Sequence, residues 1–435
     1  MEPKQTNRDR TKKNRGPGGQ PNMLNQVLFV VQILVGAIGV YQFVLSVWGW
    51  AGKKKAANHE PRKSFAVLIA AHNEEKVVGA LIDNLLNLNY PREMYDVFVI
   101  CDNCTDDTAR IARQYPGVIA CEREDKHRRG KGFAIEWMLK ELWSRSRQYD
   151  GVVMLDADNL VERDFLLHMN NSLCAGHQVI QGYLDTKNPE DSWITAAYGI
   201  TYWFCNRLWQ LPRTRLRMAN FLGGTGMCFD SGLLKEMGWG ATSLVEDLEF
   251  TVRCVQRGIY PTMNYEAKVY DEKPLSFRAS ARQRLRWMQG HFSVARRYFF
   301  PLLWSSIKER NLAKFDTALY TVTVYNVLVG SLLTLVLWFD QARPGVPAFT
   351  SIYYYLPIWV TGISLFVSCA QFPFAMMLEK VKSWKVYAHL LLFPIFLLSW
   401  WPITLYAFFT QNNKTWSHTQ HTRVLRLEEV RGKQM

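Results

Sequence analysis

The sequence lacks the two common nucleotide-binding signatures. No G-x-G-x-x-G follows the first apolar run, Phe65–Ala71, and no Walker A sequence occurs in the chain. The first absence argues against a dinucleotide-binding Rossmann site, and the second argues against a P-loop NTPase. A nucleotide bound by this protein must therefore be held by other motifs.

Cysteine is scarce and scattered. Only eight of 435 residues are cysteine, and most lie between Cys101 and Cys254, in a region that we expect to be cytosolic. A disulfide framework is therefore excluded as the organising feature of the fold. Cys101 and Cys104 form a C-x-x-C, but no second pair follows at zinc spacing, so a structural zinc site has little support.

Acidic residues are outnumbered by basic ones. The formal net charge is +14, which suits either nucleic acid or an anionic membrane surface as a partner. Apolar residues make up 48% of the chain, and 16 tryptophans suggest a membrane interface. The long apolar runs favour the membrane, and we predict no nucleic-acid partner.

Charge is absent from Leu24 to Gly49, which predicts a membrane helix over residues 23–50 behind a disordered basic tail, 1–22. Three further membrane helices are predicted between residues 317 and 410, at about 317–339, 352–378 and 386–410. Lysines before the last span and a basic tail, 411–435, both indicate the cytoplasm. One span before the domain and three after it would put the tail on the opposite side of the membrane from the domain. The assignments therefore conflict, unless the last span, which contains Pro394 and Pro402, is broken or re-entrant.

Strands and helices alternate between the first membrane helix and the later ones. Apolar runs at Phe65–Ala71, Asp96–Cys101 and Val152–Leu155 predict strands, and helical patterns at Val77–Leu88 and Thr108–Gln114 follow the first two. This order predicts an α/β domain with a mostly parallel sheet, which we place at residues 60–276. Ligands of such sheets bind at the carboxyl ends of the strands.

Two acids follow the third of these strands. Side chains on a strand alternate between faces, so Asp156 and Asp158 are predicted to point the same way. Carboxylate oxygens placed at the mouth of a cleft suit Mg²⁺ or Mn²⁺ carrying a diphosphate. A solvated strand end is the alternative interpretation.

Two amphipathic helices are predicted, at 190–213 and from Arg278 to Tyr298, with apolar residues at spacings of three and four. Their tryptophans, tyrosines and arginines favour a position along the membrane surface. Residues 277–316 are therefore expected to be interfacial.

Residues 64–300 resemble the family 2 membrane glycosyltransferases, the group of cellulose, hyaluronan, chitin and poly-N-acetylglucosamine synthases. The Q-x-x-R-W signature is the most specific match. The motifs occur in the family's order: Asn73-Glu74-Glu75, Asp102, Gly130-Lys131-Gly132, Asp156-Ala157-Asp158, Gly224-Thr225-Gly226, Glu246-Asp247 and Gln283-Arg284-Leu285-Arg286-Trp287. The resemblance implies a GT-A-like nucleotide-sugar-binding domain.

The resemblance also implies a site for the donor, a nucleotide sugar that we expect to be a UDP-sugar. Asp158 would bind the metal, and Lys131 would contact phosphate as a point charge. Other residues implied to hold the nucleotide sugar are Asn73, Glu75, Asp102, Asp156 and Arg286. The alternatives from the residues alone are a helix N-cap for Asp102 and a solvated basic loop for Lys131.

On the acceptor side, Asp247 is predicted to be the general base, with Glu246 as the fallback and a helix-terminal acid as the structural alternative. The resemblance implies that Gly224, Thr225, Gly226, Gln283 and Trp287 line the acceptor site. Trp416 and Thr419 in the tail resemble a segment that closes over the bound donor.

We expect a processive, inverting polysaccharide synthase that passes its product through its own membrane helices. The alternative is a non-processive transferase that adds a single sugar to a lipid. Both predict an integral protein, which we expect in a bacterial plasma membrane with its catalytic domain in the cytoplasm. The sequence identifies neither the sugar that is transferred nor a protein partner.

Overall fold

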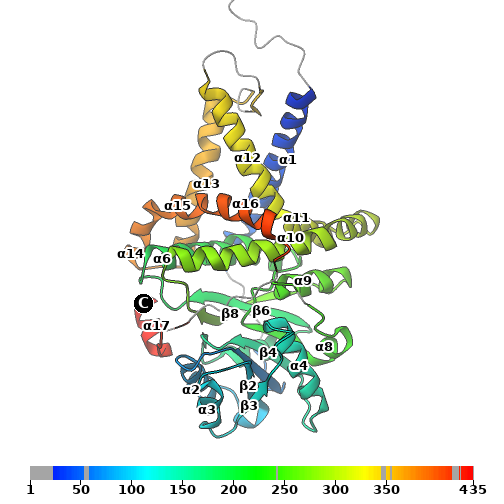
Figure 1. Ribbon diagram of the computed structural model, residues 1–435, viewed down its shortest axis with the longest axis vertical. Helices are drawn as coiled ribbons and strands as arrows, with labels where there is room; N and C mark the ends of the chain where they lie inside the picture. The colour runs from blue at the N-terminus through cyan, green and yellow to red at the C-terminus, as the bar shows by residue number, and fades with distance from the viewer. Residues whose placement is uncertain are drawn as a thin grey trace, which may run out of the picture.

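The computed structural model describes residues 23–52, 58–241, 243–343, 349–352, 355–413, 421 and 423–434. The basic tail predicted at 1–22 and the predicted closing residues Trp416 and Thr419 lie outside this part of the chain. An α/β domain lies at one end of the molecule, and long apolar helices extend from it at the other end (Figure 1).

An eight-stranded sheet organises the described part of the domain, in the order β3-β2-β1-β4-β7-β6-β8-β5. Strands β3, β2, β1 and β4 are parallel, β7 is antiparallel to both of its neighbours, and β6 pairs with β8 in parallel. The strands are β1 Phe65–Ala71, β2 Tyr95–Asp102, β3 Val118–Arg123, β4 Gly151–Asp156, β5 Leu160–Val161, β6 Val179–Thr186, β7 Met227–Asp230 and β8 Thr262–Asp271. The predicted strands therefore form, with bounds that differ by at most a residue.

Helices cover both faces of the sheet because the buried strands are apolar on both sides. In β1, Val67 and Ile69 pack under α2, α3 and α5, while Ala66 and Leu68 pack under α4, α8 and α9. These helices are α2 Val78–Leu86, α3 Thr108–Arg113, α4 Lys131–Ser144, α5 Phe165–Cys174, α8 Ser231–Met237 and α9 Glu246–Gln256, and a short turn, η2, spans Arg92–Met94.

A layer of helices separates the sheet from the apolar end of the molecule. The predicted helix 190–213 forms three segments, α6 Trp193–Phe204, the π-helical η3 Cys205–Gln210 and α7 Leu211–Arg215. It is joined in this layer by α10 Phe277–Lys308 and α11 Leu312–Thr321. Residues of α6 pack against Met376, Phe393 and Phe396 of the membrane-side helices, so α6 lies between domain and membrane helices.

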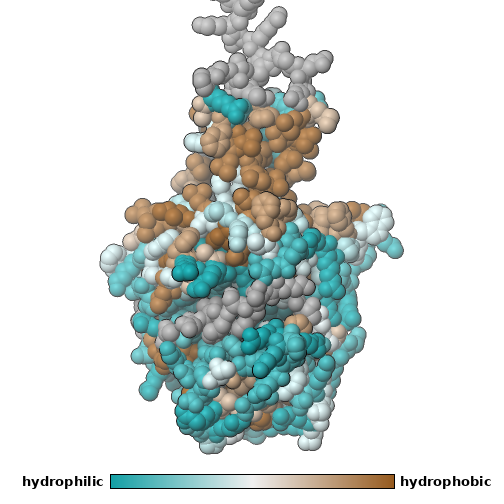
Figure 2. Space-filling view, in the orientation of Figure 1, coloured by the Kyte–Doolittle hydropathy of each residue, from teal (hydrophilic) through white to brown (hydrophobic). Residues whose placement is uncertain are grey.

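In the described part of the chain, four segments are long and apolar enough to cross a membrane: Met23–Gly49, Thr323–Ala342, Ile358–Leu378 and Phe393–Thr410. The first three correspond to α1 Met23–Ser46 with the short η1 Val47–Gly49, to α12 Thr323–Ala342 and to α13 Ile358–Leu378. Figure 1 shows α1, α12 and α13 rising away from the domain. Figure 2 shows that their surface is hydrophobic, whereas the surface of the domain is mostly hydrophilic.

The fourth segment differs from the other three. It is broken at Ser399 into α15 Phe393–Leu398 and α16 Trp400–Thr410, which run across the base of the other three helices (Figure 1). Arg284 of α10 holds this break, because its guanidinium donates to the Ser399 hydroxyl at 2.8 Å and stacks on Phe396 and Trp400. The short segments α14 Trp384–Ala388 and η5 His389–Leu391 precede α15.

The tail returns to the domain. The last helix, α17, spans Leu427–Gln434, and Leu425, Leu427 and Val430 pack against Leu160 and Tyr270 at the edge of the sheet. The tail and the domain therefore lie on the same side of the apolar helices. This arrangement agrees with the broken form of the last span, which the sequence left open.

Candidate active site

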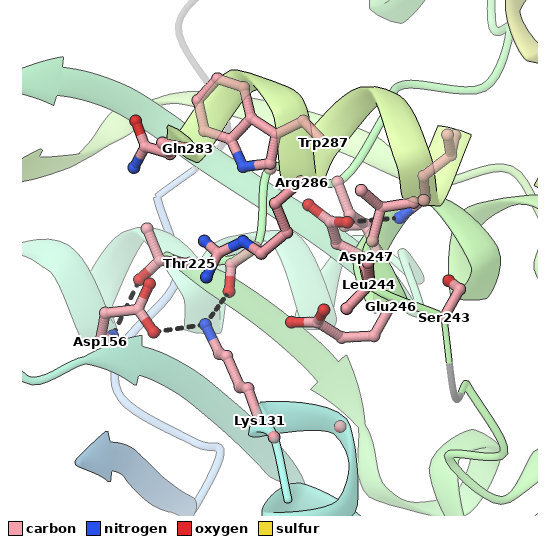
Figure 3. Close-up of a pocket in the computed structure, with 18 of the residues that line it drawn as sticks. Lys131, Asp156, Thr225, Ser243, Leu244, Glu246, Asp247, Gln283, Arg286 and Trp287 are labelled. Atoms are coloured by element: carbon pink, nitrogen blue, oxygen red, sulfur yellow. Dashed lines mark hydrogen bonds and ion pairs between the residues drawn. The ribbon is translucent and has the colours of Figure 1, made fainter. Parts of the chain in front are cut away.

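A cavity of about 930 Å³ opens where the parallel strands end, under the helical layer. Most of the predicted site residues line it: Asp102, Lys131, Asp156, Asp158, Gly224, Thr225, Glu246, Asp247, Gln283, Arg286 and Trp287. Three predicted residues, Asn73, Glu75 and Gly226, are not part of this lining. Figure 3 shows Lys131, Asp156 and Glu246 on one side and Gln283 and Trp287 of α10 on the other, with Arg286 reaching down between them.

The side chains of Asn73 and Glu75 hold two loops together instead. The Asn73 Oδ1 atom accepts from the Thr105 amide at 2.7 Å, and the Glu75 carboxylate accepts from the Asp107 amide at 3.1 Å. Asn73 has a positive φ of 56°, so the chain turns sharply there. As a result Glu74, between them, lines the cavity.

The two acids after β4 differ in their surroundings. The strand ends at Asp156, so Asp158 lies in a turn, and the predicted alternation along a strand does not extend to it. The side chain of Asp156 is 39% exposed and pairs with Lys131. Asp158 is buried, and its carboxylate accepts from the amide of Glu272 at 2.8 Å and from Asn159 at 3.2 Å.

Lys131 links the two sides of the cavity. It is the first residue of α4, and its ammonium pairs with Asp156 and donates to the carbonyl oxygen of Gly224 at 2.6 Å. The pKa of Lys131 is raised, because its interactions with Asp156, Glu246 and Asp247 outweigh the lowering by burial. Lys131 is therefore a cation amid carboxylates from β4 and α9.

Asp247 lies in the first turn of α9, where its Oδ1 atom accepts from the Leu248 amide at 2.7 Å. Burial, and then the charge of Glu246, raise the pKa of Asp247 to about 7. Gly224 has a φ of +82°, and a Cβ at that position would lie 3.3 Å from the Asp247 Oδ2 atom. Glycine thus lets the backbone approach this carboxylate closely.

Asp102, at the end of β2, forms a buried ion pair with Arg123 at 2.5 Å. Burial raises the pKa of Asp102, while Arg123 lowers it. In α10, the Oε1 atom of Gln283 accepts from the Tyr198 hydroxyl at 3.0 Å. Figure 3 shows the Arg286 guanidinium pointing into the cavity toward Lys131 and Thr225.

One cavity residue that the sequence did not single out comes from the tail. His421 lies 2.9 Å from the Glu74 carboxylate, and the charges of Asp158, Glu74 and Glu272 raise the pKa of its imidazole to about 10, against the lowering by burial. Burial raises the pKa of Glu74 to about 7. His421 comes soon after the predicted tail motif, and that proximity was the only sequence signal for it.

Lys187, Tyr202, Asp271 and Lys273 were also missed. Lys187 is buried and donates to the carbonyl oxygen of Asp158 at 2.6 Å. The other three line the cavity, near the ends of α6 and β8. No motif contains them, and only the fold brings them to the site.

Several known proteins are similar to this chain. A model of the family described as "Glycosyltransferase like family 2" matches residues 61–290. A β-monoglucosyldiacylglycerol synthase of a Nostoc species is 27% identical over 292 residues, which are 64% of this chain. The matched part spans only 59% of the length of that relative.

Two further relatives have different names. A poly-β-1,6-N-acetyl-D-glucosamine synthase of Staphylococcus aureus is 24% identical, and the match covers 70% of this chain and 72% of the relative. The probable glycosyltransferase YdaM of Bacillus subtilis is 21% identical, with 89% and 94% covered.

Among solved structures, a mannosyltransferase from Pyrobaculum calidifontis, in complex with GDP-Man and Mn²⁺, superposes with a TM-score of 0.53 at 17% identity. The match covers 85% of this chain and 98% of that one. The predicted GT-A-like α/β fold with a mostly parallel sheet is confirmed.

Proposed function

This chain belongs to glycosyltransferase-like family 2, and from that premise we propose that it moves a sugar from a UDP-sugar to an acceptor hydroxyl with inversion at the anomeric carbon. One observation carries the proposal. A single cavity is lined both by residues suited to a sugar diphosphate, Lys131 and Asp158, and by a carboxylate with a pKa of about 7, Asp247.

The donor would bind across the carboxyl ends of the strands. Asp102 accepts hydrogen bonds from the base or ribose while Arg123 holds its carboxylate in place. Lys131 and Arg286 contact the diphosphate from opposite sides of the cavity. For Lys131, phosphate oxygens replace the carboxylate of Asp156 as the partner of the ammonium.

The base would be Asp247. Its carboxylate takes the proton of the acceptor hydroxyl as that oxygen attacks the anomeric carbon, and the bond from this carbon to the UDP oxygen breaks. A base works best when its pKa lies close to the working pH, and burial beside Glu246 raises the pKa of Asp247 to about 7. Glu246, on the same turn, sustains that value through its charge.

A divalent cation fits the charge of this site. Glu74, Asp158 and Glu272 all line the cavity, and all three act on the imidazole of His421, so their carboxylates are gathered in one part of the site. Among the described residues, no three metal-ligand side chains already surround one point, so a cation would share its ligands with the donor. Asp158, with the carboxylates of Glu74 and Glu272 beside it, would hold Mg²⁺ or Mn²⁺, and the bound ion would neutralise the diphosphate.

The acceptor, we infer, is a membrane lipid. The cavity reaches Tyr320 of α11 and Trp400 and Gln411 at the two ends of α16, so it extends to the helices that face the bilayer. The membrane helices do not form a closed bundle in the described part of the chain, because only 6%, 22% and 11% of the apolar windows in α1, α12 and α13 are buried. A lipid headgroup could reach Asp247 from the membrane surface without a channel.

A growing polysaccharide is the second candidate. It is favoured by Gln283, Arg286 and Trp287 on the roof of the cavity, which form the Q-x-x-R-W motif. The S. aureus relative carries the name of a polysaccharide synthase, and the Nostoc relative carries that of a glycolipid synthase. The names of the relatives therefore do not decide between the two acceptors.

The site would lie on the cytoplasmic face of a bacterial plasma membrane. The loop after α13 carries Lys380, Lys382 and Lys385, and positive loops favour the cytoplasmic side. The domain and the tail both lie on the side of this loop, as Figure 1 shows.

The test uses full-length protein in nanodiscs with Mg²⁺ or Mn²⁺, a panel of radiolabelled UDP-sugars, and diacylglycerol. We expect a chloroform-soluble product that carries one sugar. Label in a water-soluble product of many sugars would support the polysaccharide candidate instead. Transfer from none of the UDP-sugars, with intact binding of a different nucleotide, would contradict the proposed donor.

A further inference from the structure

Three cavity residues outside all of the sequence motifs lie together. Tyr202 comes from α6, and Asp271 and Lys273 come from the end of β8 and the residues after it. All three line the cavity described above. They share the cavity with Asp156 and Asp158, although α6 and β8 are far apart in the sequence.

Lys273 holds the other two residues in place. Its side chain is 4% exposed, and its ammonium donates to the Asp271 Oδ2 atom at 2.6 Å. The same ammonium lies 3.4 Å from the centre of the Tyr202 ring, which is a close cation–π contact. The trio is therefore a rigid unit that is already formed in the absence of substrate.

Two polar groups of this unit still have hydrogen-bonding capacity. The Asp271 Oδ1 atom is buried and accepts no hydrogen bond from the described part of the chain. The hydroxyl of Tyr202 also makes no hydrogen bond within that part. A buried acceptor without a partner costs free energy, and a hydroxyl group of a bound ligand could supply the missing hydrogen bond.

The unit lies between the two ends of the proposed reaction. Burial, and then the charges of groups that include Asp271, Asp247 and Asp156, raise the pKa of the Tyr202 hydroxyl well above its ordinary value. Asp271 in turn interacts with Asp158 and Asp156. A sugar that joins a diphosphate at Asp158 to a base at Asp247 must pass between these same groups.

The backbone beside Tyr202 is unusual. The π-helical segment η3 begins at Cys205, directly after α6, and Thr201, Tyr202 and Cys205 all line the cavity. A π-helical turn is rare and is found most often at functional sites, where it changes the direction of side chains. The insertion thus marks this end of α6 independently of the hydrogen-bond argument.

We propose that Tyr202 and Asp271, held by Lys273, bind the hydroxyl groups of the sugar that is transferred. This inference rests on the proposed function. Asp271 accepts a hydrogen bond from one sugar hydroxyl, and the Tyr202 hydroxyl bonds to a neighbouring oxygen. Neither residue moves a proton in the reaction, so both determine donor binding and sugar selectivity.

The charge of this subsite limits the class of sugar. Asp156, Asp158, Asp247 and Asp271 line this part of the cavity, and two of its cations are already paired, Lys131 with Asp156 and Lys273 with Asp271. The carboxylate of a uronic acid bound there would be repelled by these like charges in a buried site. The sugar is therefore a neutral hexose or N-acetylhexosamine, and a uronic acid is rejected.

The experiment compares the affinity of UDP with that of phosphonate analogues of UDP-glucose and UDP-N-acetylglucosamine, which cannot be turned over. Full-length protein in nanodiscs with Mg²⁺ is used. Y202F and D271N are each expected to weaken binding of the tighter-binding analogue about tenfold. Their affinity for UDP should stay within about twofold of that of wild-type protein. Y149F is the control, because it removes a tyrosine hydroxyl that lies outside the cavity lining, where it bonds the carboxylate of Asp96.

A second arm identifies the contact. Among deoxy versions of the analogue, the one that lacks the bound hydroxyl should bind wild-type protein and D271N equally, whereas the others keep the difference. The analogue of UDP-glucuronic acid should bind wild-type protein at least tenfold more weakly than that of UDP-glucose. D271N should narrow this gap.

The outcomes separate the two proposals. If wild-type protein binds the analogue and Y202F and D271N bind it equally well, the subsite is wrong and the proposed function stands. Equal losses for UDP and for the analogue would show a general structural effect and would also overturn the subsite. If wild-type protein binds neither UDP nor any analogue, both proposals fail.

Discussion

The ammonium of Lys131 lies 2.6 Å from the carbonyl oxygen of Gly224, which is the residue whose backbone approaches Asp247. Through this contact the proposed phosphate-binding side of the cavity is joined to the side that holds the proposed base. A change in the partners of Lys131, such as the binding of a phosphate, is therefore expected to affect the backbone beside Asp247.

Asp247→Asn should reduce the rate of sugar transfer by about 10²- to 10⁴-fold, because the acceptor proton loses its base. Binding of UDP should remain within a few fold, since the amide keeps the shape of the side chain. The measurement is initial rate and UDP affinity on the same preparation. Glu246→Gln is the matched control, and a larger rate loss in this variant would identify Glu246 as the base.

The pH dependence follows from the pKa of Asp247. A base must be deprotonated, so the rate should fall about tenfold per pH unit below a midpoint near 7 and level off above it. The charge of Glu246 helps to raise this pKa. In Glu246→Gln the midpoint should therefore move to lower pH, as measured by pH–rate profiles with saturating donor. An unmoved midpoint would contradict the assignment.

Lys131→Met should raise the KM for the UDP-sugar about 10- to 100-fold, because a charge-assisted contact to phosphate is lost. Lys126→Met is the matched control, since Lys126 is an exposed lysine in the preceding loop. Steady-state kinetics with varied donor distinguish the two. A solvated loop, the alternative interpretation of this segment, predicts equal and small effects.

Removal of divalent cations by EDTA should abolish transfer, and Mg²⁺ or Mn²⁺ should restore it in wild-type protein. Glu74→Gln should raise the Mn²⁺ concentration needed for half-maximal activity, while Asp158→Asn should not recover at any tested concentration. Titration of activity with Mn²⁺ provides the measurement. Full activity in EDTA would contradict the metal.

A buried ion pair ties the interfacial layer together, because Arg213 of α7 forms two hydrogen bonds to Asp316 of α11, at 2.8 and 2.9 Å. Their side chains are 1% and 0% exposed. Asp316→Asn should lower stability by about 3–5 kcal/mol, since it leaves a buried charge unpaired. The thermal melt in detergent is the readout. The double variant Arg213→Met/Asp316→Leu should recover much of the loss.

The sequence predicted the strands well, and most of the predicted site residues line the cavity. Phe65–Ala71 is apolar throughout, so its burial on both faces could be inferred from composition alone. Asp102 and Asp156 directly end strands, and the ends of parallel strands meet at one edge of a sheet. Local pattern was sufficient in these places.

Other parts of the site depend on tertiary contacts that no local pattern records. The positive φ at Asn73 turns the chain so that Glu74 lines the cavity, whereas Asn73 and Glu75 do not. Lys273 and Tyr202 meet because the end of β8 packs below α6. The π-helical turn after Phe204 interrupts the 3.6-residue period, so one continuous helix was predicted where three segments occur.

The crosswise course of α15 and α16 has a mechanical consequence for the bilayer. These helices, together with α10, would take up area in the leaflet that faces the domain, while among the described helices α1, α12 and α13 would cross to the other leaflet. Such a shape acts as a wedge, and wedges bind more readily where a membrane is curved. Protein reconstituted in a bilayer should therefore be enriched in its highly curved parts relative to the flat parts of the same bilayer.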